Sequence, residues 1–199
     1  MIEYLKKSKP EIEKIEDDKK VRSSVEEILS NIKKNGDKAI RSYSEKFDDY
    51  SPKAFRLTDS EIKECISQVS PKDLDDIKFA QEQIRNFAEI QKETMKDVEV
   101  ETLPGVILGH RNIPVESVGC YVPGGKFPMI ASAHMSVITA SVAGVERIIA
   151  SAPPQNGTPH PAIVTAMHLG GANEIYCLGG LYRLHWVRDG DCYFTKALL

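Results

Sequence analysis

Apolar residues recur with a helical period through the first half of the chain. A first helix is expected to end at Asn35-Gly36, because glycine readily takes the left-handed conformation that stops a helix. Its apolar face consists of Val21, Val25, Ile28, Leu29 and Ile32. Asp37 is expected to cap a short second helix. The apolar residues of that helix are Ala39, Ile40, Tyr43 and Phe47.

Two further helices begin at capping sequences. Thr58 and Glu61 have the spacing of a capping box, in which the hydroxyl accepts from a first-turn N–H and the carboxylate reaches back. Ser70-Pro71 supplies a cap and a proline at the first helical position. The core-facing residues expected in the long helix that follows are Leu74, Ile77, Ala80 or Gln81, Ile84, Phe87 and Ile90. We predict packing, and no chemistry, for these helices.

The second half of the chain changes to strand patterns. Segments 98–103 and 106–113 are predicted to form a hairpin that turns at Pro104-Gly105. From Ser117 onward short apolar strands alternate with helices. The strands are expected at 118–122, 147–152 and 174–178, and the helices at 131–145 and 161–169. This order predicts an α/β fold with a parallel sheet covered on both faces.

The same patterns divide the chain into four parts. We expect an N-terminal helical region over 1–96, connecting strands over 97–116, a partial α/β domain over 117–180 and an atypical tail over 181–199. Charge follows this division, since residues 1–100 hold 20 Lys/Arg and 23 Asp/Glu, whereas residues 101–199 hold 6 and 6.

Composition narrows the class of protein. A net charge of −3 gives no electrostatic reason to expect nucleic acid or an anionic membrane as a partner. The four cysteines lie far apart, without a C-x-x-C pair, which favours reduced thiols over disulfides or a zinc knuckle. The N-terminus lacks the apolar core of a secretory signal, and the uncharged run 127–145 suits a buried helix better than a membrane span. A cytoplasmic protein is expected.

Two glycine-containing loops are the candidate ligand sites. Ligands of parallel α/β sheets bind at the carboxyl ends of the strands, where residues 121–128 and Gly179-Gly180 are predicted to lie. Paired glycines let backbone N–H groups approach a ligand, but they also serve simply to turn a strand into a helix, so both roles stay open. Neither G-x-G-x-x-G nor a phosphate-binding P-loop is present.

Several motifs in order resemble the histidinol dehydrogenase family. They are V-G-C-Y-V-P-G-G-K-F-P at 118–128, V-A-G-V at 142–145, G-A-N-E-I-Y-C-L-G-G at 171–180, N-G-D-K-A-I at 35–40 and K-F-D at 46–48. The resemblance covers about residues 20–180. It implies an incomplete Rossmann-like sheet and a homodimeric enzyme that oxidises a primary alcohol through an aldehyde to a carboxylate, with two NAD and a zinc ion.

Two branches of that family are candidates for the substrate. A-S-A-H-M-S-V at 131–137, I-A-S-A-P-P at 149–154 and H-P-A-I-V at 160–164 are similar to the sulfopropanediol dehydrogenase branch, so a dihydroxypropanesulfonate is preferred over histidinol. A third interpretation, from another class, is a non-catalytic nucleotide-binding or interaction module.

The resemblance assigns only cofactor residues to this chain. Tyr121 matches the family's tyrosine that contacts NAD, and Gly124 and Gly125 match the adjoining loop. A family glutamine that also contacts NAD is replaced by Tyr182. The family's zinc ligands and its Glu-His acid–base pair lie farther along, so no catalytic or metal residue is predicted here.

The histidines are expected to be structural. His134 could approach a sulfonate as a donor, but a satisfied structural role is favoured. His110, His160 and His168 lack a partner at metal-ligand spacing and are predicted to be structural.

The tail after Gly180 departs from the resemblance. The family expects an apolar helix rich in Ala and Gly, whereas this tail contains the only tryptophan, Trp186. We expect an altered reading frame from about Leu181 and a truncated enzyme. A sheet cut after its third strand would leave an open edge, so we also expect a poorly soluble chain without dehydrogenase activity.

Overall fold

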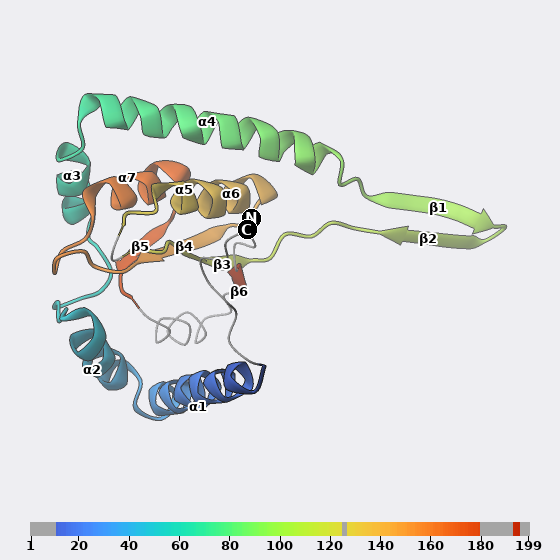
Figure 1. Cartoon of the computed structure of the whole chain (residues 1–199). Helices are drawn as coiled ribbons and strands as arrows, with labels where there is room; N and C mark the ends of the chain where they lie inside the picture. Colours follow the sequence, from blue (N-terminus) through green and yellow to red (C-terminus); the bar gives the residue numbers. More distant parts are fainter. Residues whose placement is uncertain (1–10, 125–126, 180–192, 196–199) are drawn as a thin grey trace, which may run out of the picture.

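The sheet at the centre of the molecule has helices on both of its faces (Figure 1). The computed structural model describes residues 11–124, 127–179 and 193–195. Three central strands, β3 (Ser117–Tyr121), β4 (Arg147–Ala152) and β5 (Glu174–Cys177), run parallel in the order β5-β4-β3. The predicted α/β fold with an N-terminal helical segment and a parallel sheet is confirmed.

The helical segment begins and ends largely where local sequence dictates. Its helices are α1 (Glu11–Asn35), α2 (Asp37–Asp48), α3 (Asp59–Ser67) and α4 (Pro71–Glu93). α1 ends at Asn35 as predicted, and Gly36 takes a positive φ of 54°, but its ψ of −136° lies outside the left-handed region that was expected. At α3 the Thr58 N–H donates to Glu61 Oε2 at 2.7 Å, and the Glu61 N–H donates to Thr58 Oγ1 at 3.3 Å. The capping box is therefore confirmed.

One predicted cap is wrong. Asp37 is the first residue of α2, not its cap; Gly36 holds the cap position, and no side chain caps the N-terminus of α2. The acidic Asp37 still lies in the first turn, where its negative charge interacts favourably with the helix dipole.

The helix after β3 is one continuous rod with an irregular middle. It consists of α5 (Ile130–Ala133), the π-helical turn η1 (His134–Ile138) and α6 (Thr139–Ala143). Its extent agrees with the predicted helix over 131–145, but the π-helical turn has no signal in the apolar pattern. The next helix, α7 (Pro161–Gly170), follows β4 as predicted.

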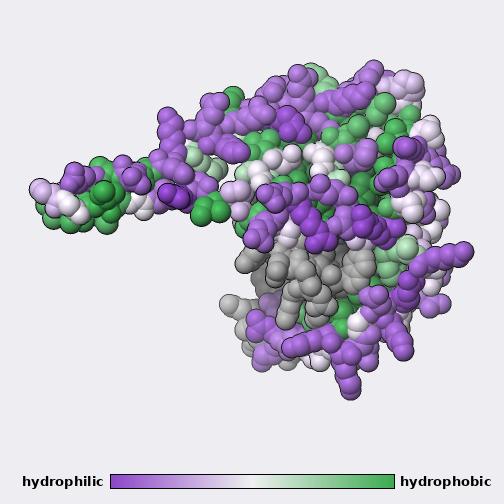
Figure 2. All heavy atoms as spheres, turned by 180° about the vertical axis from the view of Figure 1, so that it is seen from behind, coloured by the Kyte–Doolittle hydropathy of each residue, from purple (hydrophilic) through white to green (hydrophobic). Residues whose placement is uncertain are grey.

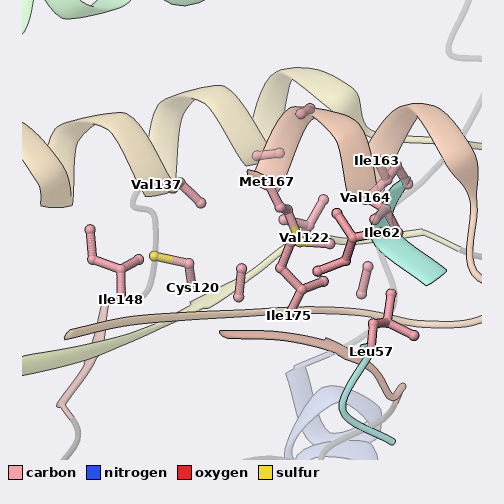
Figure 3. Packing of buried hydrophobic residues seen from close by; sticks show 14 of the residues in the cluster. Leu57, Ile62, Cys120, Val122, Val137, Ile148, Ile163, Val164, Met167 and Ile175 are labelled. Atoms are coloured by element: carbon pink, nitrogen blue, oxygen red, sulfur yellow. The ribbon is translucent and has the colours of Figure 1, made fainter. Parts of the chain in front are cut away.

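Both faces of the sheet have an apolar core. On one face, α5, η1, α6 and α7 pack against the strands, and α3 and α4 cover these helices from outside. Figure 3 shows Met167 reaching from α7 toward Val122 and Ile175. On the other face α1 and α2 cover the sheet. The buried residues of this second core are Ile32, Ala39, Ile40, Phe55, Ile149, Tyr176 and Leu178.

Both edges of the central sheet are paired within the described residues. Beyond β5, the Leu57 N–H donates to Ile175 O at 2.8 Å and the Cys177 N–H donates to Phe55 O at 2.9 Å. Beyond β3, the tail contributes β6 (Tyr193–Thr195) in parallel register. At Tyr193–Thr195 the tail does continue the sheet, against the expectation, and it does so beside β3. The open edge expected beyond the third strand, β5, is instead paired with Phe55–Leu57.

An antiparallel hairpin projects away from this body (Figures 1 and 2). It consists of β1 (Val98–Leu103) and β2 (Val106–His110), joined at Gly105 with a φ of 81°. The hairpin and its turn are confirmed, although β2 ends at His110, three residues before the predicted Ile113.

Candidate functional site

The two glycine-containing loops lie at the same edge of the sheet. Register pairs Tyr121 at the end of β3 with Ser151 in β4, and Ala152 in β4 with Cys177 at the end of β5. The loops that leave all three strands therefore start side by side at the carboxyl edge, which is where ligands of parallel sheets bind. The predicted convergence of the Tyr121 loop and the Gly179 loop is confirmed at the level of the backbone.

Close backbone contacts tie these loops together. The Val122 N–H donates to Ser151 O, and the Leu178 N–H donates to Ala152 O, both at 2.8 Å. A Cβ at Gly124 would lie 3.1 Å from Cγ of Pro153, in the loop after β4. Gly124 therefore lets the first loop lie directly on its neighbour, which is a packing reason for glycine at this position.

Tyr121 is half-buried at the end of β3. Of its neighbours, Val122 is buried and Gly124 is half-buried. Gly125, Gly180 and Tyr182 lie outside the described residues, so their predicted roles stay predictions.

Asp48 is a further residue at this edge. It is the last residue of α2, and its carboxylate lies against the backbone of Gly179. A Cβ at Gly179 would be 2.8 Å from Oδ1 and 2.9 Å from Cγ of Asp48. The K-F-D motif drew attention to Asp48, but nothing in its spacing indicates contact with a residue 131 positions later.

Behind Asp48 lies a buried thiol that is unsuited to nucleophilic chemistry. Burial raises the pKa of Cys177 to about 12, against the opposing effect of a hydrogen bond with Tyr50. Burial, followed by the proximity of Cys177, also raises the pKa of the Tyr50 hydroxyl. Both groups stay protonated near neutral pH, so neither supplies an activated nucleophile or a general base.

The histidines have structural partners. His134 is buried in η1, with its Nδ1 3.2 Å from Nε2 of Gln81, and the same Gln81 amide donates to Ala166 O at 2.8 Å. Burial lowers the pKa of His134, which keeps the ring neutral. His160 accepts from the Ile163 N–H at 3.4 Å as the cap of α7. The structural interpretation of His134 and His160 is confirmed.

Zinc does not fit the part of the chain that the structure describes. Among these residues no three His, Cys, Asp or Glu side chains come together as a metal site. His110, at the end of β2, contacts Lys96 O, and His168 is exposed on α7. Within the same residues, no helix has the length and apolarity to cross a membrane.

Comparison with known proteins decides the family. The histidinol dehydrogenase family model matches residues 12–183. The chain belongs to the histidinol dehydrogenase family. The fold agrees: the crystal structure of histidinol dehydrogenase from Elizabethkingia anophelis superposes with a TM-score of 0.79 at 28% identity, over 94% of this chain and 41% of that one.

Several curated relatives are more similar in sequence to this chain than the Elizabethkingia anophelis enzyme is. A histidinol dehydrogenase homolog of Shouchella clausii is 51% identical over 91% of this chain and 43% of its own length. Sulfopropanediol 3-dehydrogenase of Ruegeria pomeroyi is 45% identical over 90% of this chain and 41% of its own length. Histidinol dehydrogenase of Methanosarcina barkeri is 38% identical over 81% of this chain and 37% of its own length. The chain thus spans about two fifths of the length of these relatives.

Proposed function

We propose that this chain provides part of the NAD site of a cytoplasmic, zinc-requiring alcohol dehydrogenase that oxidises a primary alcohol to a carboxylate in two steps. The observation that carries the proposal is the convergence of Tyr121, Gly124 and Gly179 at the carboxyl edge of a parallel sheet, in a member of the histidinol dehydrogenase family. NAD held at this edge would supply the hydride acceptor for both oxidation stages.

The residues of this site that the structure describes are proposed to bind and orient the cofactor. Tyr121 offers a ring face to a flat heterocycle, and Gly124 brings the backbone close to it. Asp48 holds the second loop through Gly179. We place the acid–base pair and the zinc ligands in the part of the family's sequence that this chain does not span.

A dihydroxypropanesulfonate is the proposed substrate, with histidinol as the alternative. Identity supports this order, since it is 45% to the Ruegeria pomeroyi sulfopropanediol enzyme and 38% to the Methanosarcina barkeri histidinol enzyme. The substrate-branch motifs at 149–154 and 160–164 support it independently of His134, whose ring is buried against Gln81.

Replacing Tyr121 with alanine is expected to weaken NAD binding by about 10-fold, because an aromatic ring that stacks on a ligand contributes roughly 0.5–1.5 kcal/mol beyond its buried area. Titration of the 199-residue chain with NAD measures the effect. Tyr121→Phe is the matched control, since it keeps the ring and removes the hydroxyl. Equal affinity of Tyr121→Ala and the unaltered chain would contradict the proposed site.

The unaltered chain is expected to form no NADH with either alcohol, because no three His, Cys, Asp or Glu side chains among the described residues come together as a metal site. Steady NADH formation would show that the chain is sufficient for catalysis.

Deletion, in the host, of the gene for the complete enzyme to which this chain is proposed to contribute tests the substrate. We expect extracts to lose NAD reduction with sulfopropanediol, while the strain still grows without added histidine. A requirement for histidine would instead support the histidinol reaction. Unchanged activity with both alcohols would favour a non-catalytic binding module.

A further inference from the structure

Two adjoining cavities lie where α4 leads into the projecting hairpin (Figure 1). The outer cavity has a volume of about 640 Å³ between the last turns of α4, the end of α6 and the base of the hairpin. The inner cavity, of about 310 Å³, lies between η1, α6 and the start of β3. Pro114, Thr139 and Ala143 line both. Cavities that hold small molecules have volumes of roughly 300–1,000 Å³.

The lining of the inner cavity is apolar. Its hydroxyl groups belong to Ser136 and Thr139, and both are engaged within their own helix. Ser136 Oγ donates to Ser132 O at 2.6 Å, and Thr139 Oγ1 donates to Met135 O. A hydroxyl has a single proton to donate, so neither group is left to donate to a ligand. The inner cavity therefore suits a hydrocarbon chain. Its aliphatic lining residues are Val115, Val118, Met135, Ala140 and Val145.

The π-helical turn η1 borders the same cavity. It contributes Met135 and Ser136 to the lining. Turns of this kind are rare within helices, and they occur frequently at functional sites. An irregular turn beside an apolar cavity is thus a second, independent reason to expect a bound molecule there.

The ammonium group of Lys92 lies where the two cavities adjoin. Lys92 Nζ donates to Val142 O at 2.7 Å, which fixes the ammonium at the end of α6. A Cβ at Gly144 would lie 3.6 Å from Cγ of Pro114 and 3.8 Å from the same Nζ, so the ammonium is also near Pro114. The remaining N–H groups of the ammonium are available to an anion.

Arg111 adds a second positive charge to the outer cavity. Among the residues that the structure describes, no carboxylate pairs with its guanidinium group. The acidic residue in the lining is Asp97, whose Oδ1 accepts from the Asn112 N–H at 2.8 Å and from Asn112 Nδ2 at 3.3 Å. Asp97 therefore holds the base of the hairpin together. Two cations against one engaged carboxylate leave the outer cavity complementary to an anion.

We propose that these cavities bind an aliphatic carboxylate, with its chain in the inner cavity and its carboxylate at Lys92 and Arg111. Burial of the chain removes hydrocarbon surface from water, and the planar guanidinium group pairs well with a carboxylate. The site is separate from the proposed NAD site, because Pro114 and Val115 precede β3 whereas Tyr121 ends it.

Calorimetric titration of the 199-residue chain with decanoate tests the proposal. We expect saturable binding of one decanoate per chain. Decanol, which lacks the charge, and acetate, which lacks the chain, should each bind at least roughly 10-fold more weakly. Absence of saturable decanoate binding would overturn the site. Equal affinities for decanol and decanoate would overturn the role of the cations.

Ala143→Phe tests the location of the site. Ala143 is exposed and lines both cavities, so a phenyl ring there occupies their junction without entering the core. We expect the affinity for decanoate to fall by roughly 10-fold or more. Ala54→Phe adds the same ring to an exposed alanine between α2 and α3, outside the cavities, and should leave the affinity unchanged. Equal decanoate affinities of the two variants would contradict the location.

Arg111→Gln tests the contact with the carboxylate. We expect roughly 10-fold weaker binding of decanoate and unchanged binding of decanol, because a charge-assisted hydrogen bond is lost. Arg22→Gln makes the same change on exposed α1, away from the cavities, and should have no effect. Both arginines are exposed, so both variants should keep the circular dichroism spectrum of the unaltered chain. If the two variants bind decanoate equally well, Arg111 does not hold the carboxylate.

Discussion

Replacing Met167 with alanine is expected to lower the free energy of unfolding by about 2–5 kcal/mol. Met167 is 0% exposed at the centre of the larger core, where α7 meets the sheet. Removing its side chain takes away packed apolar volume and leaves a cavity that the surrounding strands and helices can fill only in part. Urea unfolding followed by circular dichroism measures the change.

Met129→Ala is the matched control for this variant. Met129 lies just before α5 and is 43% exposed, so the same substitution should change stability by less than about 0.5 kcal/mol. If both variants lose the same stability, the packing around α7 is not as described. If the chain unfolds in two steps, a separate free energy of unfolding is measured for each step.

Replacing Gly179 with alanine is expected to destabilise the fold by about 1–3 kcal/mol, because the added methyl group would overlap the Asp48 carboxylate. The methyl forces either α2 or the loop after β5 to move. Since this loop lies at the proposed NAD site, cofactor affinity should fall together with stability. Thermal unfolding and NAD titration of the variant measure the two effects.

A double-mutant cycle separates this overlap from a general intolerance of alanine. Asp48→Ala alone is expected to destabilise the chain, because Asp48 takes part in polar interactions. With Asp48→Ala and Gly179→Ala combined, part of the loss should be recovered, giving a coupling of about 0.5–3 kcal/mol. Strict additivity of the two losses would mean that Asp48 does not restrict position 179.

Local signals predicted most element boundaries. The stop at Gly36, the capping box at Thr58, the cap at Ser70 and the hairpin turn at Gly105 each depend on a few neighbouring residues, and the structure contains all four. Strands β3, β4 and β5 were equally readable, because short apolar segments between turn residues suit a buried parallel sheet.

The errors come from geometry that neighbouring residues do not determine. The stripe predicted for α4 advances in steps of three with a single step of four, and each step of three rotates it by about 60° around a helix with 3.6 residues per turn. It therefore leaves the core near its end, where Phe87 and Ile90 are exposed and Ala88 is buried. The π-helical turn η1 and the pairing of β6 with β3 likewise have no local signature.

The candidate site was only partly predictable for the same reason. Tyr121 and Gly124 follow a buried strand, so their place at the carboxyl edge could be inferred from strand order. Asp48 comes from α2, which covers the face of the sheet opposite to α7. Its contact with Gly179 depends on how α2 packs against the sheet. A single sequence contains no information about such a distance.

The pairing of Phe55–Leu57 with β5 has a consequence for synthesis on the ribosome. The Leu57 N–H finds its acceptor only when Ile175 has been made, roughly 120 residues later. At about 5–20 residues per second, this delay lasts on the order of 6–24 s. During that time α1 and α2 lack the sheet that buries their apolar faces, and an isolated helix as short as the 12-residue α2 is marginal in water. The nascent chain is thus a natural client for chaperones that hold exposed amphipathic helices near the exit tunnel.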